Sequence, residues 1–274
     1  MRIVLAIASK EVQDATRNRW FWLYTGAFAL LAAALSATAL LGSGFGGLAG
    51  YGRTTASLIN LVLLIVPLMG LTAGASSMAG ERERGTLAYL MAQPVARFEV
   101  FWGKYLGQAL GLGSSLVLGF GLSGMLVGLR GGREQSALYL TLLGLSLLLA
   151  LASLGLGFLV ATLVRRSSAA MGVVLVVWLA LAFLGDLGLM GLTSGLHLKA
   201  PTLFHLSLAN PLSVFRTASV LSLRSSLEAM GPAGLYAVRA YGPATMALLL
   251  GALAAWAALP ATLSYAVFRR RSIL

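Results

Sequence analysis

The sequence contains no cysteine among its 274 residues. This absence excludes disulfides, thiolate metal sites and cysteine nucleophiles. Charged residues are also scarce, at 10% of the chain, whereas soluble domains carry roughly a quarter. Apolar residues make up 58% of the chain and the mean hydropathy is +0.88. The composition therefore predicts an integral membrane protein.

Motifs for common hydrolytic chemistry are missing as well. The phosphate-binding pattern GxxxxGK[ST] fails at its candidate Gly103-Lys104, because Tyr105 follows the lysine and Phe98 stands where the first glycine is required. The chain has no HExxH or GxSxG segment, and no paired carboxylates within an apolar run. We therefore expect a chain that is not an enzyme and that binds no cofactor, including ATP, by itself.

Ionisable groups are almost absent from the apolar runs. Asp186 is the one acid within such a run. It lies far from the inner end of its predicted helix, which favours a position at the outer headgroups. A role in binding substrate or protons is the alternative. His197 and His205 are the only histidines, and packing is favoured over a metal site, which needs further ligands. Because an ion-driven transporter needs several ionisable groups near the midplane, this scarcity indicates an external energy source.

Acidic residues are few relative to basic ones, which leaves a formal net charge of +12. In a soluble protein this balance would suggest a nucleic-acid partner. Here most charges lie at the ends of apolar runs, where they set topology and meet anionic lipid headgroups. We therefore expect membrane lipid, and no nucleic acid, as a partner.

Long uncharged runs define the expected fold class. A helix needs about 20 apolar residues to cross the hydrocarbon layer, and the alternating strands of a membrane barrel are absent from the sequence. The sequence predicts an all-α integral membrane protein with one transmembrane domain over 1–274. Its six transmembrane helices are expected at 20–41, 54–80, 105–129, 135–164, 167–192 and 240–268.

Six spans would place both termini on one side of the membrane, and positive residues indicate which side. The segments on the side of the termini hold thirteen Lys and Arg residues, whereas the opposite segments hold seven over a longer total length. We therefore expect both termini in the cytoplasm. The expected cytoplasmic segments are 1–19, 81–104, 165–166 and 269–274, and the main outer loop is 193–242.

Two further patterns concern helix packing. Residues 1–19 carry apolar side chains at helical spacing, which predicts an amphipathic helix along the inner interface. An interfacial anchor with no further role is the simpler alternative. Small residues four apart let helices approach closely, and they occur within the spans at Gly70/Gly74, Gly107/Gly111 and Gly124/Gly128.

The segment 81–104 is densely charged and lies between two apolar runs. Residues 81–89 are expected to extend the preceding helix beyond the bilayer, and Gln93-Pro94 to turn the chain. Residues 97–104 would form a second short helix leading into the third span. Such an elbow can transmit the movement of a partner; the alternative is an ordinary positive-inside loop.

This segment, E-R-E-R-G-T-L-A-Y-L-M-A-Q-P-V-A-R-F-E-V-F-W-G-K, resembles the hallmark of ABC-2 type permeases. These are six-span subunits of ATP-binding-cassette exporters, and the start A-S-K-E-V-x-D-x-x-R-N-R-W at 8–20 is similar to theirs. The resemblance implies an interfacial elbow helix at 1–19 and a separate ATPase subunit that binds ATP and Mg. The residues expected to meet that ATPase are Glu81, Arg82, Glu83, Arg84, Gly85, Thr86, Pro94 and Arg97.

A closer resemblance is to the permeases that serve copper-site maturation of nitrous oxide reductase. It rests on the same two segments and on N-P-L-S-V-F-R at 210–216, although Leu212-Ser213 departs from the expected small residue and acid. It implies a homodimer in the bacterial inner membrane, two ATPase copies and a periplasmic β-helix protein. That protein would meet a periplasmic loop, 193–242, at Asn210, Pro211, Phe215 and Arg216.

The cargo is not readable from the residues themselves. The closer resemblance implies export of a sulfur species for copper-cluster assembly. The first alternative is an ABC-2 permease that exports a drug, a lipid or another small molecule. A membrane scaffold with no transport role is the alternative from a different class.

Overall fold

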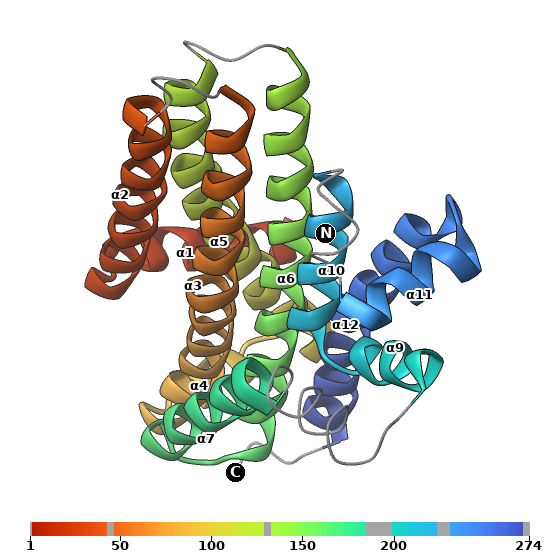
Figure 1. The fold of residues 1–274 in the computed structure, drawn as a ribbon. Helices are drawn as coiled ribbons and strands as arrows, with labels where there is room; N and C mark the ends of the chain where they lie inside the picture. Colours follow the sequence, from red (N-terminus) through yellow and green to blue (C-terminus); the bar gives the residue numbers. More distant parts are fainter. Residues whose placement is uncertain (1, 43–46, 129–132, 185–198, 224–230, 271–274) are drawn as a thin grey trace.

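The computed structural model describes residues 2–42, 47–128, 133–184, 199–223 and 231–270 (Figure 1). Every regular element in these residues is a helix, which confirms the all-α class. The helices are α1 (Arg2–Arg17), α2 (Arg19–Gly42), α3 (Gly47–Glu83), α4 (Thr86–Met91), α5 (Arg97–Gly128), α6 (Arg133–Leu163), α7 (Ser167–Leu179) with a π-helical end η1 (Ala180–Leu184), α9 (Ala200–Leu208), α10 (Pro211–Ser222), α11 (Gly231–Tyr241) and α12 (Ala244–Arg270).

Four of the described helices, α3, α5, α6 and α12, are long and apolar enough to cross a membrane. Helices α1 and α2 meet at a bend of 69°, and the number rises to five if this pair counts as one span. The apolar helix Ser167–Phe183 is shorter, and the end of the predicted span 167–192 lies outside the described residues. A multi-pass membrane protein is therefore established, while six spans remain a prediction.

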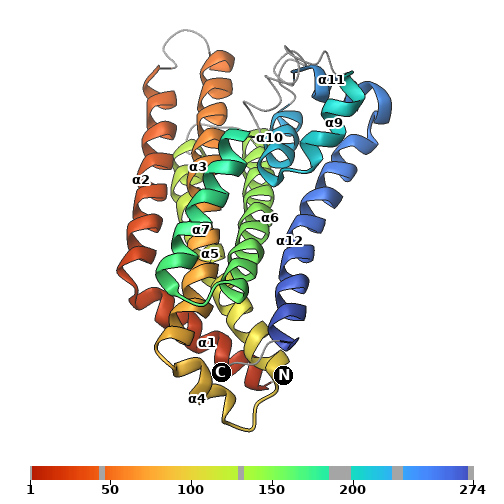
Figure 2. The ribbon, with the colours of Figure 1, turned by 90° about the horizontal axis from the view of Figure 1, so that it is seen from below.

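The long helices form a bundle around α6, which packs against α3, α5 and α12. Helix α3 also packs against α2 and α7, and α5 against α1 and α2. Figure 2 shows α4 at one end of the bundle, together with the start of α1 and the end of α12, and α9, α10 and α11 at the opposite end. We call these the α4 end and the α10 end.

Close approach of α3 and α6 depends on glycine. A Cβ atom added to Gly74 would lie 2.6 Å from the Leu154 carbonyl oxygen, and one added to Gly157 would lie 2.4 Å from that of Leu71. Gly70 is similarly crowded, because a Cβ atom added to it would lie 2.7 Å from Ser153 Cβ. The close approach predicted for Gly70 and Gly74 is confirmed. In lipid, such contact replaces the hydrophobic force that would join helices in water.

In the described part of the outer loop expected at 193–242, the chain forms three short helices, α9, α10 and α11. Pro211 begins α10, and the Asn210 side chain accepts a hydrogen bond from the Leu212 backbone nitrogen at 2.9 Å, which caps this helix. Helix α10 then packs inward against α6, α12 and α3. Asp186 and His197 lie outside the described residues, and His205 is exposed on α9.

The two ends of the bundle should face opposite sides of the membrane. Because the sequence has no cysteine, Thr86→Cys on α4 and Thr202→Cys on α9 each introduce a single thiol at an exposed position. A membrane-impermeant maleimide should label Thr202→Cys in spheroplasts and Thr86→Cys only in inside-out vesicles. Labelling of both thiols from one side would contradict the predicted orientation.

Candidate functional site

The candidate site lies at the α4 end, where the chain turns from α3 through α4 into α5. The predicted continuous helix from Glu81 to Tyr89 is wrong, because α3 ends at Glu83 and α4 begins at Thr86. Gly85 makes the break with φ of 74°, a conformation that glycine adopts without strain. Residues 97–104 are likewise not a separate short helix but the first turns of α5.

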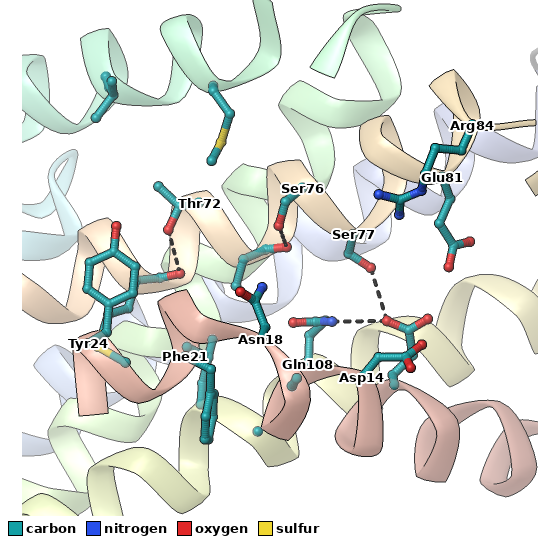
Figure 3. A pocket seen from close by; sticks show the side chains of 18 residues that line it. Asp14, Asn18, Phe21, Tyr24, Thr72, Ser76, Ser77, Glu81, Arg84 and Gln108 are labelled. Carbon is teal, nitrogen blue, oxygen red and sulfur yellow. Dashed lines mark hydrogen bonds between the residues drawn. The ribbon is translucent and has the colours of Figure 1, made fainter. Parts of the chain in front are cut away.

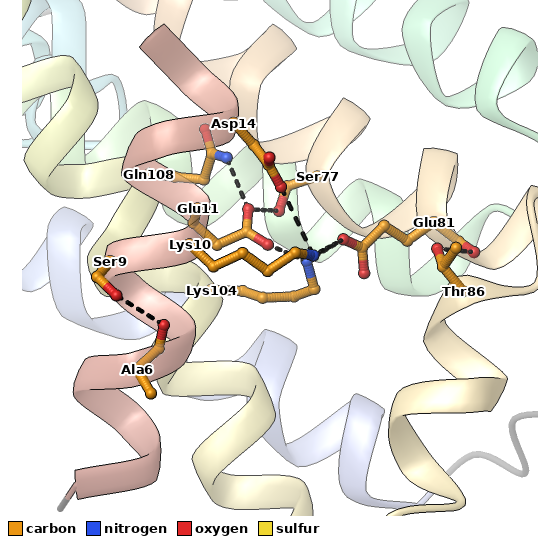
Figure 4. A network of polar contacts seen from close by, with 10 residues as sticks. All are labelled: Ala6, Ser9, Lys10, Glu11, Asp14, Ser77, Glu81, Thr86, Lys104 and Gln108. Carbon is orange, nitrogen blue, oxygen red and sulfur yellow. Dashed lines mark hydrogen bonds and ion pairs between the residues drawn. The ribbon is translucent and has the colours of Figure 1, made fainter. Parts of the chain in front are cut away.

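A buried lysine joins three helices at this end. The Lys104 side chain on α5 is 1% exposed, and its Nζ contacts carboxylate oxygens of Glu11 on α1 and, at 2.8 Å, of Glu81 on α3 (Figure 4). Lys10 Nζ lies 3.7 Å from the same Glu81 oxygen. Two carboxylates thus face one buried and one exposed ammonium, which balances the buried charge.

Neutral side chains complete the coordination of Glu11. Its Oε2 atom accepts a hydrogen bond from Gln108 Nε2 at 2.9 Å and one from Ser77 Oγ at 3.4 Å. These partners come from α5 and α3, the same helices that supply Lys104 and Glu81. The carboxylate is therefore satisfied on both oxygens, as a buried charge requires.

Glycines on α5 allow α1 to reach this network. A Cβ atom added to Gly107 would lie 2.4 Å from Glu11 Cβ and 2.8 Å from the Ala8 carbonyl oxygen. One turn earlier, a Cβ on Gly103 would lie 2.8 Å from Ile7 Cβ. The close approach predicted for Gly107 is confirmed, and the contact is with the N-terminal helix.

The next two residues of the charged motif tie α3 to α6 and α7. Arg82 donates hydrogen bonds to the carbonyl oxygens of Ala161 at 2.9 Å and Val164 at 3.1 Å, where α6 ends. Glu83 Oε2 accepts a hydrogen bond from the Ser167 backbone nitrogen at 3.2 Å, where α7 begins. Each charge has the sign that the helix terminus favours, since carbonyls attract cations and N–H groups attract anions.

Arg97 makes the corresponding tie between α5 and α12. Its guanidinium donates a hydrogen bond to the Arg269 carbonyl oxygen at 2.7 Å, in the last turn of α12. The Glu99 carboxylate accepts a hydrogen bond from the Ala96 nitrogen at 3.1 Å and so caps the start of α5. Together with Glu81, Arg82 and Glu83, Arg97 holds the ends of six helices together. We call these four residues the motif ties.

The remaining predicted ATPase-facing residues lie on the surface. Arg84, Gly85, Thr86 and Pro94 are all exposed. Two aromatic residues beside them were not predicted: Tyr89 on α4 is 74% exposed and Phe98 at the start of α5 is 52% exposed. Their exposure depends on how α4 and α5 turn against the bundle, which the sequence pattern does not reveal.

The residues predicted to meet a periplasmic partner are distributed differently. Pro211 and Phe215 are buried within the chain, with Phe215 fully enclosed. Asn210 is half-buried, and its Nδ2 donates a hydrogen bond to the Leu181 carbonyl oxygen of η1 at 2.7 Å. Arg216 is the one of the four with an exposed side chain. The first three therefore position α10, and Arg216 faces outward.

Comparisons with known proteins identify the class that this bundle belongs to. The chain matches the family described as ABC-2 family transporter protein over residues 5–273, and it belongs to that family. Members of this kind are permease subunits and work with an ATPase partner.

Two relatives narrow the assignment. The chain is 31% identical over 280 residues to the probable ABC transporter permease protein NosY of Pseudomonas aeruginosa, with 100% of both chains covered. It is also 31% identical to the protein of the same name from Stutzerimonas stutzeri, with 99% of each chain covered.

Within the described residues, no group of three His, Asp or Glu side chains could hold a metal ion.

Removing the buried ammonium should destabilise the α4 end. In Lys104→Met, the Glu11 and Glu81 carboxylates would face each other without the cation between them. A broken buried pair costs about 3–5 kcal/mol, so the unfolding free energy of the purified protein should fall by that order. Lys10→Met is the control: its side chain is 61% exposed, and exposed pairs contribute about 1 kcal/mol or less. Equal losses in both variants would contradict the assigned role of Lys104.

Docking of α1 on α5 should fail when a methyl group is added at their contact. Gly107→Ala places Cβ within 2.4 Å of Glu11 Cβ, whereas Gly121→Ala on the same helix meets nothing within 4 Å. Limited proteolysis should cut α1 in the first variant and spare it in the second. Protection of α1 in both would mean that α1 shifts to accommodate the methyl group.

Proposed function

We propose that this chain is the transmembrane subunit of an ABC exporter, driven by ATP hydrolysis in a separate ATPase subunit. Family membership supports a partner ATPase, and the sequence has no nucleotide-binding loop of its own. The observation that carries the proposal is the division of the charged motif at the α4 end. Some of its residues form the motif ties, while others are left exposed for a partner.

The proposed contact surface is α4 and its flanks. Arg84, Thr86, Tyr89, Pro94 and Phe98 are exposed there. The surface combines aromatic and Arg side chains, the residue types that contribute most to protein interfaces. It has one guanidinium, two hydroxyl groups and two aromatic rings within a short stretch of chain.

The motif ties can convert movement of this surface into movement of the bundle. Displacing α4 would displace the end of α3, to which Gly85 connects it directly. From there, Glu81 acts on α1 and α5, Arg82 on α6 and Glu83 on α7. Packed helices respond to such pushes by small rigid-body shifts, which supports conformational coupling to nucleotide turnover.

Positive charge supports a cytoplasmic position for the α4 end in the bacterial inner membrane. Thirteen of the 20 Lys and Arg residues lie in the segments expected there. The α10 end would then face the periplasm.

The finer proposal concerns partners and cargo. The full-length similarity to NosY supports the same role here, as the permease of a NosDFY-like transporter. The assembly would contain a homodimer of this chain, two copies of a NosF-like ATPase and a NosD-like periplasmic β-helix protein at the α10 end. Its cargo would be a sulfur species for the copper cluster of nitrous oxide reductase.

Affinity purification of the tagged chain from its native membrane tests both levels. The ATPase and the periplasmic protein should co-elute with the wild type. Tyr89→Asp places a charge on the proposed ATPase surface and should remove the ATPase while retaining the periplasmic partner. Arg216→Glu should do the reverse, so each variant is the folding control for the other.

Two outcomes would contradict these proposals. Retention of the ATPase by Tyr89→Asp, with unchanged ATP hydrolysis, would remove α4 as the coupling surface. Elution of an ATPase without any β-helix protein would reject the NosDFY-like assembly. That result would leave an ABC-2 permease for a drug, a lipid or another small molecule.

A further inference from the structure

A cavity of about 470 Å³ opens beside the lysine network (Figure 3). It is lined by residues of α1, α2, α3, α5 and α7. The lining residues on α3 run from Met69 to Glu81, which corresponds to about 18 Å along the helix at 1.5 Å per residue. The volume lies within the range of small-molecule sites, about 300–1,000 Å³, and the shape is elongated.

The lining changes character along its length. Asp14, Glu81 and Arg84 lie at one end, and Phe21 and Tyr24 lie toward the other (Figure 3). The remaining lining is uncharged apart from Glu11: it combines the apolar Met69, Leu112, Met171 and Leu175 with the neutral polar Asn18, Thr72, Ser76 and Ser77. The cavity therefore suits a molecule with a charged head and an apolar tail.

The charged end offers both a cationic donor and oxygen acceptors that the described residues do not use. The Arg84 guanidinium folds back over Gly80, with its terminal nitrogens 3.7 and 3.8 Å from a Cβ built there. It makes no ion pair or hydrogen bond to the part of the chain that the structure describes. Glu81 uses only Oε1 for both lysines, and the Gln108 amide oxygen accepts no hydrogen bond from the described residues. An anionic group can bind Arg84 while a cation binds Glu81 and Gln108.

We propose that this cavity binds one phospholipid with a zwitterionic, primary-ammonium headgroup. Its phosphate would pair with Arg84, and its ammonium would donate hydrogen bonds to Glu81, Gln108 and Asp14. An anionic headgroup would meet the carboxylates without a compensating ammonium. A quaternary ammonium has no N–H group to donate and is typically recognised by an aromatic cage, whereas the rings of Phe21 and Tyr24 lie away from the charged end (Figure 3).

The position of the cavity relative to the membrane agrees with this ligand. Helix α1, which supplies Asp14, is amphipathic and crosses the foot of α2 at 69°, as an interfacial helix does. The headgroup would lie at the level of α1. The start of one of its two acyl chains would extend along the first turns of α2, beside Phe21 and Tyr24, and the rest of the lipid would lie in the bilayer.

Native mass spectrometry of the full-length chain, purified with any co-eluting subunits, tests the site. The protein is titrated with phosphatidylethanolamine, phosphatidylcholine and phosphatidylglycerol of identical acyl chains. One phosphatidylethanolamine should bind per chain, at least tenfold more tightly than the other two lipids. Arg84→Ala should weaken it about tenfold or more through the loss of a charge-assisted contact.

Blocking the tail end provides a second, independent variant. Ala73→Phe places a ring in the cavity lining and should abolish retention of the lipid. Two controls are Arg165→Ala, an exposed cation outside the lining, and Ala254→Phe on an exposed face of α12. Both should bind phosphatidylethanolamine like the wild type.

Three results would overturn the proposal. The first is equal binding of the three lipids, and the second is unchanged binding in Arg84→Ala. The third is an amphiphile other than phosphatidylethanolamine that co-purifies with the wild type and is absent from Ala73→Phe. Because Arg84 is exposed, its variant should fold and remains decisive even if Ala73→Phe is unstable. Arg84 also belongs to the proposed ATPase surface, so Tyr89→Asp, which lies outside the cavity lining and should lose the ATPase while keeping the lipid, separates the two roles.

Discussion

The Lys104 ammonium, enclosed by the carboxylates of Glu11 and Glu81, is the interaction on which the α4 end depends. None of these charges can be buried alone, because each would lose its hydration without compensation. They become buried only when α1, α5 and α3 meet, so one contact fixes three helices at once. Gly103 and Gly107 supply the necessary proximity, since a side chain at either position would hold α1 away from α5.

The charged motif combines two tasks that would ordinarily fall to separate segments. Burial of apolar surface does little to hold helices together in lipid. Among the motif ties, Glu81 instead joins helices by ion pairs, and Arg82, Glu83 and Arg97 do so by hydrogen bonds to helix termini. Arg82 and Glu83 exploit the carbonyls at the end of α6 and the N–H groups at the start of α7. The neighbouring Arg84, Thr86 and Tyr89 then stand on a rigid base, which makes their surface suitable for a partner that applies force.

The sequence was sufficient for the helical membrane class, the family and the location of the charged segment. It could not show which charges turn inward, because their partners are remote: Glu11 and Lys104 are 93 residues apart, and Arg82 and Val164 are 82 apart. The break at Gly85 and the burial of Phe215 also depend on tertiary packing. Six spans, the orientation and the named partners are still predictions.

Helix α7 is anchored at both ends by single side chains. Glu83 holds its first backbone nitrogen, and Asn210 holds a carbonyl oxygen in its π-helical last turn. Helix α7 therefore connects the charged motif directly to the residue that caps α10. A shift of the α3 terminus at the α4 end is therefore connected through α7 to the start of α10, 127 residues further along the chain than Glu83.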